Sequence, residues 1–360
     1  MKITSLRTYK FSVPTGQAIY DPATGELLSS TSKPWLFLKL ETDTGICGWG
    51  EGTGEWLTEP VEATLHAWQE LLIGRNPLHV TALCDDIQDR LPWKGGPVFG
   101  SAIAAINQAL YDIAGHAWGV PVHTILGGAR RDRVRVYAHT SLDSEEAAVE
   151  GARHVQAAGY AGVKANPLET RTWVRDHAAV RQSTACVAAI RQALGEDFDI
   201  LLDAHGSPMP ELSLEFAAAT APYRPLLLEE PVKVGSVAAL TEVTAKCPIP
   251  IATGEKLFHL RDFQPLIDAR ACAYLQPDVC HAFGITGLVE IGRAAQQAQM
   301  QMAPHNVGGP LSLAATLTAD AVTPNFLIQE LVDAWFRRFD DYVEHDWQIG
   351  DGHINVSDAP

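Results

Sequence analysis

Short apolar runs recur along the chain from about residue 133 onward, and each is followed by a segment with helical periodicity. Each apolar run is followed by roughly 15 to 25 residues of helical character, which contain helices such as 234–246 and 286–300. Strands that alternate with helices form parallel sheets, and eight such units favour a closed barrel. A doubly wound sheet is the alternative, but no GxGxxG motif follows the first run. The eight runs are VRVYAHTS, GVKANP, DILLDAHG, LLLEEP, IPIATGE, YLQPDVC, QMAPHN and FLIQEL.

The N-terminal part of the chain has a different, mixed pattern. Residues 2–13 and 35–42 alternate as strands do, and a helical pattern covers 101–118 until Gly119 ends it. Between the two strands, residues 14–34 are polar and contain Gly and Pro, which is typical of a mobile loop rather than a regular element. The pattern predicts a separate α+β unit before the barrel.

Composition and charge restrict the class of protein. The 360 residues are 46% hydrophobic, enough for a large core, and the net charge of -16 argues against a nucleic-acid partner. No apolar run approaches the length of a membrane span, and MKITSLRTYKFSV lacks the apolar centre of a signal peptide. The six cysteines are scattered without a CxxC pair, as in reduced proteins. We expect a cytoplasmic protein that binds neither nucleic acid nor membrane.

Polar side chains end seven of the eight apolar runs. In a barrel of parallel strands the C-terminal ends open onto one face, where catalytic groups collect. Positions that are distant in sequence therefore meet in space. Asp203 and His205, two residues apart, can both project to one side of their strand. The strand-end residues are Lys164, Asn166, Asp203, His205, Glu229, Glu230, Glu255, Asp278, His305 and Glu330.

Three of these acids, Asp203, Glu229 and Glu255, lie 26 residues apart on successive strands. Carboxylates clustered in a low dielectric repel each other unless a cation lies between them. Oxygen ligands without cysteine suit Mg²⁺, with Mn²⁺ possible. The alternative is that each acid caps a helix or pairs with a base. A zinc hydrolase would need more histidine ligands than these strands offer.

Two histidines accompany the acids. Asp278 and His305 end consecutive strands, and a histidine held by a carboxylate is oriented and more basic, as a general base should be. His205 lies beside Asp203. Each could instead be a core histidine that bonds a backbone carbonyl. Two imidazoles facing one substrate suggest one proton removed and one proton donated.

Several motifs together resemble a known family. LLDAHG, LLLEEP, IATGEKL, LQPDVCHAFGIT and MAPHNVGGPL are similar to the mandelate racemase subgroup of the enolase superfamily, as are ETDTGICGWGE, WKGGP and ALYDIAG. Within this subgroup the chain most resembles the D-galactonate dehydratase type. The resemblance implies an α+β capping domain over 1–125, a modified TIM barrel of the (β/α)₇β type over 126–331, and a C-terminal segment, 332–360, that returns to the cap. It also implies a homo-oligomer, a dimer or an octamer.

The resemblance further implies a ligand set. Asp203, Glu229 and Glu255 would bind an essential Mg²⁺, which in turn binds the carboxylate of an acid sugar and stabilises the enediolate formed from it. The choice of Glu229 over Glu230 rests on this resemblance, because strand alternation alone does not decide which one faces inward. Lys164 would be a cation near the substrate carboxylate.

The same resemblance gives roles to the remaining groups. His305, paired with Asp278, matches the base that removes the C2 proton, and His205 matches the acid that protonates the departing C3 hydroxyl. Glu330 matches the acid that hydrogen-bonds a substrate carboxylate oxygen. Asn166 stands where racemases of the subgroup carry the second lysine of KxK.

These assignments imply dehydration of a sugar acid to a 2-keto-3-deoxy acid, with a D-galactonate-type substrate expected. Epimerisation or lactone cycloisomerisation on the same site is the alternative, and a degenerate binding protein is a third possibility. The loop at 14–34 is longer than in the galactonate enzyme, and PHNVGGP differs from its PHCPLGP. The stereochemistry and length of the substrate therefore stay open.

Overall fold

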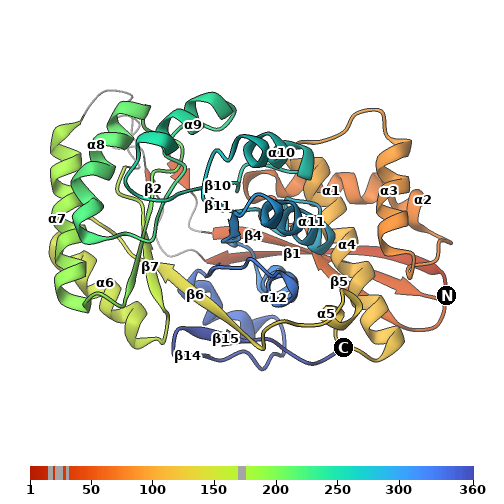
Figure 1. Ribbon diagram of the computed structural model, residues 1–360. Coiled ribbons are helices and arrows are strands. Elements are labelled where there is room, and N and C mark those ends of the chain that lie inside the picture. The colour runs from red at the N-terminus through yellow and green to blue at the C-terminus, as the bar shows by residue number, and fades with distance from the viewer. Residues whose placement is uncertain (15–18, 21–26, 30–31, 169–175) are drawn as a thin grey trace.

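The structure is a computed structural model that describes residues 1–14, 19–20, 27–29, 32–168 and 176–360. An N-terminal unit built on a small sheet lies against a barrel, and the chain ends close to both (Figure 1). We propose that the N-terminal unit ends at residue 125 and that the barrel ends at residue 331. No helix within the described ranges is both long and apolar enough to cross a membrane.

The N-terminal unit contains an antiparallel sheet in the order β1 (Ile3–Pro14), β4 (Ser32–Thr42), β5 (Cys47–Glu51). Helix α4 lies directly on β5, where a Cβ at Gly50 would approach the Ala105 carbonyl oxygen to 2.1 Å. The glycines of GWGE therefore permit the close approach of helix and strand. The helices of this unit are η1 (Glu55–Leu57), α1 (Thr58–Ala67), α2 (Gln69–Leu72), α3 (Val80–Arg90), α4 (Gly96–Trp118) and α5 (Val122–Ile125).

The segment 14–34 differs from its prediction. We expected a loop without regular structure, but β2 (Ile19–Tyr20) and β3 (Leu27–Ser29) pair as a two-stranded antiparallel sheet. Backbone pairing of this kind can form without the apolar alternation that marks a strand in the sequence. Pro14 ends β1 and residues 32–34 begin β4, while 15–18, 21–26 and 30–31 lie outside the described residues.

The barrel confirms the predicted fold class. Parallel pairing runs from β12 through to β6, and β13 pairs with β6. A bridge between Met302 and Phe326 brings β12 beside the residues before β13, which closes the ring. The described strands are β6 (Arg133–His139), β7 (Gly162–Ala165), β8 (Asp199–Asp203), β9 (Leu227–Glu229), β10 (Ile251–Thr253), β11 (Tyr274–Leu275), β12 (Gln301–Met302) and β13 (Gln329–Glu330).

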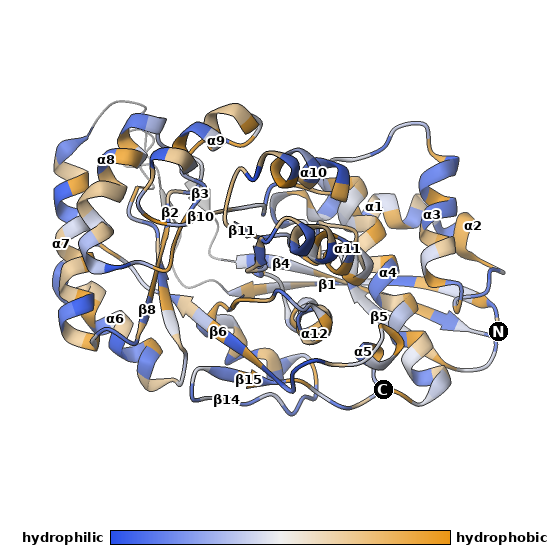
Figure 2. Cartoon of the chain, in the orientation of Figure 1, coloured by the Kyte–Doolittle hydropathy of each residue, from blue (hydrophilic) through white to orange (hydrophobic). Residues whose placement is uncertain are grey.

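Helices alternate with these strands and cover the barrel. In Figure 2, helices such as α7 and α11 carry both polar and apolar stretches, as expected when one face packs on the core. The described helices are α6 (Glu145–Ala157), α7 (His177–Leu194), α8 (Pro210–Thr220), η2 (Ala221–Tyr223), α9 (Val237–Lys246), α10 (Leu260–Ala269), α11 (Gly284–Gln297) and α12 (Pro310–Val322). Inside the ring, a buried layer forms a floor below the strand ends: Tyr137, Leu201, Leu227, Ala252, Ala303 and Ile328.

The C-terminal segment contacts both units. It contains α13 (Asp333–Phe336), η3 (Phe339–Asp341), β14 (Ile349–Gly350) and β15 (His353–Asn355). Strand β15 pairs antiparallel with β6 of the barrel. The rings of Phe339 and Tyr342 pack on Trp35 of β4, at centroid distances of 5.5 and 5.1 Å. The segment therefore ties the barrel to the N-terminal sheet.

Candidate active site

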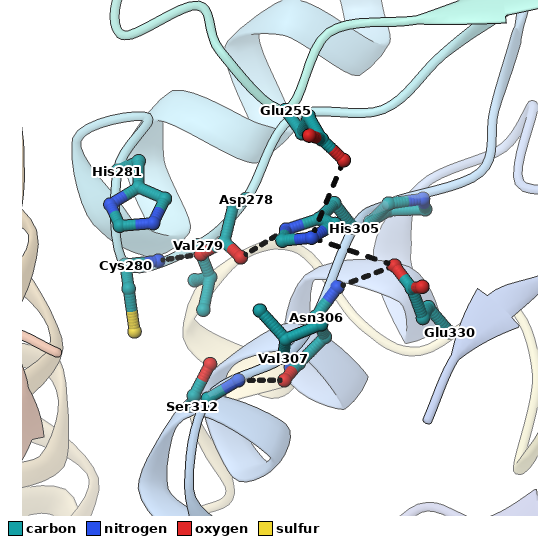
Figure 3. A network of polar contacts seen from close by, with 12 residues as sticks. Glu255, Asp278, Val279, Cys280, His281, His305, Asn306, Val307, Ser312 and Glu330 are labelled. Atoms are coloured by element: carbon teal, nitrogen blue, oxygen red, sulfur yellow. Dashed lines mark hydrogen bonds and ion pairs between the residues drawn. The ribbon is translucent and has the colours of Figure 1, made fainter. Parts of the chain in front are cut away.

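Asp278 and His305 lie just beyond β11 and β12, where they form an isolated parallel bridge. The Nδ1 atom of His305 is 2.7 Å from Oδ2 of Asp278, and the backbone N–H of Cys280 donates to Oδ1 at 2.6 Å (Figure 3). Both side chains are buried. The imidazole is thus fixed through Nδ1, which leaves Nε2 to face the centre of the barrel mouth.

The surroundings of His305 make its ring strongly basic. Burial lowers the pKa of His305, but the carboxylates of Glu330, Glu255 and Asp278 outweigh burial and raise the pKa to about 10. The Nε2 atom lies 3.5 Å from Glu255 and 3.9 Å from Glu330. The ring is therefore protonated at neutral pH in this arrangement.

Glu255 connects the two histidines predicted to face each other. Its Oε1 lies 3.5 Å from Nε2 of His205, and its Oε2 lies 3.5 Å from Nε2 of His305. The strand itself ends at Asp203, and His205 has a left-handed backbone with φ 54°. The turn, rather than the strand alternation we expected, directs His205 toward Glu255. The two imidazoles consequently face a common space.

Lys164 forms ion pairs with three acids at the barrel mouth. Its Nζ lies 2.5 Å from Glu330, 3.1 Å from Glu229 and 3.7 Å from Asp203. All four side chains are buried. Burial lowers the pKa of Lys164, but the carboxylates outweigh it and keep the ammonium charged. Lys164 therefore compensates Asp203 and Glu229, two of the three acids predicted to bind a metal ion, together with Glu330.

The three acids proposed as metal ligands have the right chemistry without a closed arrangement. Among the residues that the structure describes, no three His, Cys, Asp or Glu side chains are grouped so as to hold a metal ion. Asp203 pairs with Glu229, but the partner of Glu229 on β10 is Ala252, so Glu255 lies three residues further along the chain. Equal spacing in sequence therefore does not put the three residues in register on neighbouring strands.

Glu229 is a buried acid whose negative charge is only partly compensated. Burial raises the pKa of Glu229, the carboxylate of Asp203 raises it further, and Lys164 only partly offsets these effects. Its Oε1 atom is buried and has no hydrogen-bond partner among the described residues. A buried carboxylate oxygen without a donor is the feature that a hard cation would satisfy. The donor set therefore fits Mg²⁺.

Glu230 points to a different partner. It has φ 42° and forms an ion pair with Lys256, whose Nζ also lies 3.0 Å from Glu255. Burial and the charge of Glu255 raise the pKa of Glu230 to about 7, against the effect of Lys256. Lys256 was not predicted as a site residue. Its position directly after Glu255 in IATGEKL was the available signal.

The N-terminal unit also reaches the site, which the sequence pattern did not predict. The buried carboxylate of Glu51 accepts hydrogen bonds from the backbone N–H groups of Gly309 and Ser312, at 2.6 and 2.9 Å. Lys33 donates to the carbonyl oxygen of Val307 at 2.8 Å. These contacts hold the loop that follows His305. Long-range contacts of this kind leave no periodic signal in the sequence.

Two further residues, Asn166 and His139, lie at strand ends. Asn166 follows β7, is exposed, and brings no second amine beside Lys164. His139, at the end of β6, places Nε2 2.6 Å from Oε1 of Glu330. His139 was missed because VRVYAHTS was the one run whose polar end we did not include.

A cavity of about 610 Å³ lies away from the strand ends. It is bounded by α4, α12 and the C-terminal segment, with Trp49, His123 and Trp347 in its wall. None of the strand-end residues lines it. The candidate site is therefore identified by its converging side chains and not by this cavity.

Comparisons with known proteins agree with this architecture. Residues 11–127 match the N-terminal domain of mandelate racemase and muconate lactonizing enzyme, and residues 146–360 match the enolase C-terminal domain-like family. D-galactonate dehydratase of Ralstonia nicotianae is 38% identical over 296 residues, which are 82% of this chain and 78% of that protein. The Klebsiella pneumoniae enzyme of the same name is 37% identical over 299 residues, with the same coverage.

Solved structures give the same result. A candidate dehydratase from Salmonella typhimurium superimposes with a TM-score of 0.90 at 26% identity, over 100% of this chain and 94% of the other. One from Mesorhizobium loti gives 0.88 at 27%, over 100% and 95%. Fold, domain matches and sequence identity point the same way. The chain belongs to the enolase superfamily, in its mandelate racemase subgroup.

Proposed function

We propose that this protein is a Mg²⁺-dependent dehydratase of a sugar acid, with a D-galactonate-type substrate. The observation that carries the proposal is the position of Glu255, which lies 3.5 Å from an imidazole on each side. Two histidines facing one space can remove a proton and donate another. The D-galactonate dehydratases that the chain resembles support the substrate class.

The residues divide the reaction between them. His305, fixed by Asp278, takes the proton from C2 of the substrate, and His205 gives a proton to the hydroxyl leaving C3. The C2–H and C3–O bonds break, water departs, and the enol that remains tautomerises to a 2-keto-3-deoxy acid. His139 and Lys164 hold Glu330 close to His305, where it would meet a substrate carboxylate.

Asp203, Glu229 and Glu255 would hold the cation. When bound, Mg²⁺ supplies positive charge that stabilises the enediolate and offsets the carboxylates around His305. That offset matters because a ring protonated at neutral pH cannot accept a proton. We also propose, from the same resemblance, a cytoplasmic homo-oligomer.

Epimerisation or lactone cycloisomerisation on the same site is the second candidate. Two-base racemisation needs a second base opposite His305, and the exposed Asn166 stands where the second lysine would be. His205 occupies the other side as a proton donor. The arrangement therefore favours elimination.

The test is direct. The purified protein is incubated with Mg²⁺ and D-galactonate, alongside a panel of other aldonic acids, and 2-keto products are trapped with semicarbazide. We expect product with D-galactonate and none after chelation. Deuterium entering C2 from heavy water without keto-acid formation would instead support the second candidate. Folded protein that forms no product across the panel would refute dehydration.

A further inference from the structure

His139 lies on the rim of the candidate site, on the side of the barrel interior. It ends β6 and pairs in register with Lys164 of β7. Register partners on neighbouring parallel strands point to the same side of the sheet. Two residues earlier, Tyr137 belongs to the buried floor inside the barrel, and its ring stacks under that of His139 at an interplanar angle of 19°. His139 therefore stands directly above the floor.

The ring of His139 contacts the acid nearest the proposed base. Its Nε2 lies 2.6 Å from Oε1 of Glu330, the oxygen that also faces Lys164. The other oxygen, Oε2, accepts the backbone N–H of Asn306 at 3.2 Å and lies 3.9 Å from Nε2 of His305. Glu330 is thus held from one side by His139 and from the other by the loop of the base.

Exposure distinguishes His139 from its neighbours. Its side chain is 36% exposed, while those of Lys164 and Glu330 are 3% and 0% exposed. A group that served only to fill the barrel would be buried like Tyr137. His139 is instead the edge of this cluster that solvent and substrate can reach.

We propose that His139 is a positioning residue of the dehydration, which holds the Glu330 carboxylate so that Oε2 faces His305 and the substrate. This inference rests on the proposed function. The terminal torsion of a glutamate is soft, so its carboxylate needs a donor on one oxygen to fix the direction of the other. Lys164 alone does not supply this, because it is shared with Glu229 and Asp203. Without His139, the shared Lys164 is the one side-chain donor left to Oε1 of Glu330 among the described residues.

The kinetic test compares two substitutions at one position. His139→Gln keeps an N–H donor of similar reach, whereas His139→Leu removes it. With D-galactonate and Mg²⁺, we expect His139→Leu to lower kcat about 10- to 100-fold with KM changed less than about threefold, as for a misplaced catalytic group. His139→Gln should recover most of the rate. A His139→Leu enzyme with the wild-type kcat would overturn the proposal.

The matched control is His116→Leu. His116 is also a partly exposed histidine, 48% exposed and 3.6 Å from Asp112, but it lies away from the strand ends. We expect its kcat to equal that of the wild type. Equal losses in His116→Leu and His139→Leu would mean a general effect on folding and would also overturn the proposal.

A second measurement does not depend on turnover. Histidine labelled with ¹⁵N gives ring signals for His305, which are followed by NMR in the metal-free protein. Because Oε2 of Glu330 lies 3.9 Å from His305, we expect His139→Leu to shift the His305 ring signals and His116→Leu to leave them unchanged. If the wild type converts no sugar acid but this shift is seen, the proposed function fails while the contact of His139 with Glu330 stands. Unchanged His305 signals in His139→Leu would refute the positioning role.

Discussion

The barrel mouth has a base side, formed by Asp278 and His305, and an acid side, formed by Asp203, Glu229 and Lys164. The carboxylates on the two sides differ in whether their oxygens have hydrogen-bond donors. On the base side, Asp278 accepts from His305 and from the backbone of Cys280, and both of its oxygens have a donor. Burial raises the pKa of Asp278, but His281, His305 and these hydrogen bonds outweigh it and lower the pKa below its usual value. On the acid side, Asp203 and Glu229 share Lys164, and one oxygen of Glu229 has no donor among the described residues.

The difference separates what folding completes from what a ligand completes. A buried acid with all its donors in place stabilises the folded protein, whereas a buried acid that lacks them destabilises it. The base side is therefore preorganised by the chain itself. The acid side keeps an excess of buried negative charge, which a divalent cation would compensate. Replacing a carboxylate by an amide should therefore lower the free energy of unfolding on the base side and raise it on the acid side.

The largest effect is expected at the base. His305→Asn should lower kcat for keto-acid formation by about 10³- to 10⁴-fold, because asparagine lacks the imidazole that takes the C2 proton. The semicarbazide assay measures the loss. His154→Asn, which alters an exposed histidine 3.3 Å from Asp333, serves as the control and should keep full activity. A His305→Asn enzyme within tenfold of the wild type would exclude His305 as the base.

The next effect concerns the stability of the base side. Asp278→Asn leaves the buried imidazolium of His305 without its nearest charge partner and should lower the free energy of unfolding by about 3 kcal/mol. Urea unfolding in the presence of a chelator measures this change. Asp341→Asn, at an exposed partner of Arg338, should change the stability little. If Asp278→Asn left the free energy of unfolding unchanged, the base side would not be preorganised.

The stability of the metal-free protein should also depend on pH through His305. Its folded pKa of about 10 lies above the value of about 6.5 for an unfolded histidine, so its contribution is complete below about pH 6.5 and is lost as the pH rises toward 10. Between pH 7 and 10 we expect a loss on the order of 3 kcal/mol beyond that of His305→Asn. If the free energies of unfolding of the wild type and His305→Asn changed with pH in parallel, the raised pKa of His305 would be contradicted.

The sequence predicted the barrel because the alternation of apolar runs and helical segments is a local pattern that repeats along the chain. Each strand is an apolar run, and each run ends where the structure places a polar group, as Asp203 and Glu229 show. The pairing of β2 with β3 was missed, since short strands in a polar segment carry no such signal. His205 reaches Glu255 through a left-handed turn, which alternation along a strand does not encode.

The candidate site was predicted less completely, for reasons of register and distance. The spacing of 26 residues singled out Asp203, Glu229 and Glu255, but only the pairing of Glu229 with Ala252 reveals that Glu255 lies beyond the end of its strand. Glu51 acts on the loop after His305 from 258 residues away in the sequence. Contacts across such distances depend on how the two units pack, and a single sequence does not show that packing.

The smallest predicted effect has the opposite sign to that at Asp278. The folded pKa of Glu229 is raised by burial first and by Asp203 next, so ionised Glu229 destabilises the folded metal-free protein at neutral pH. Glu229→Gln mimics the neutral form and should raise the free energy of unfolding by about 1 kcal/mol, while activity and stabilisation by Mg²⁺ are lost. Urea unfolding with chelator and with Mg²⁺ measures both. Glu242→Gln, an exposed partner of Lys246, should give no gain. A loss like that of Asp278→Asn would mean that Glu229 is already satisfied by Lys164, and the two sides of the mouth would then not differ in the way described.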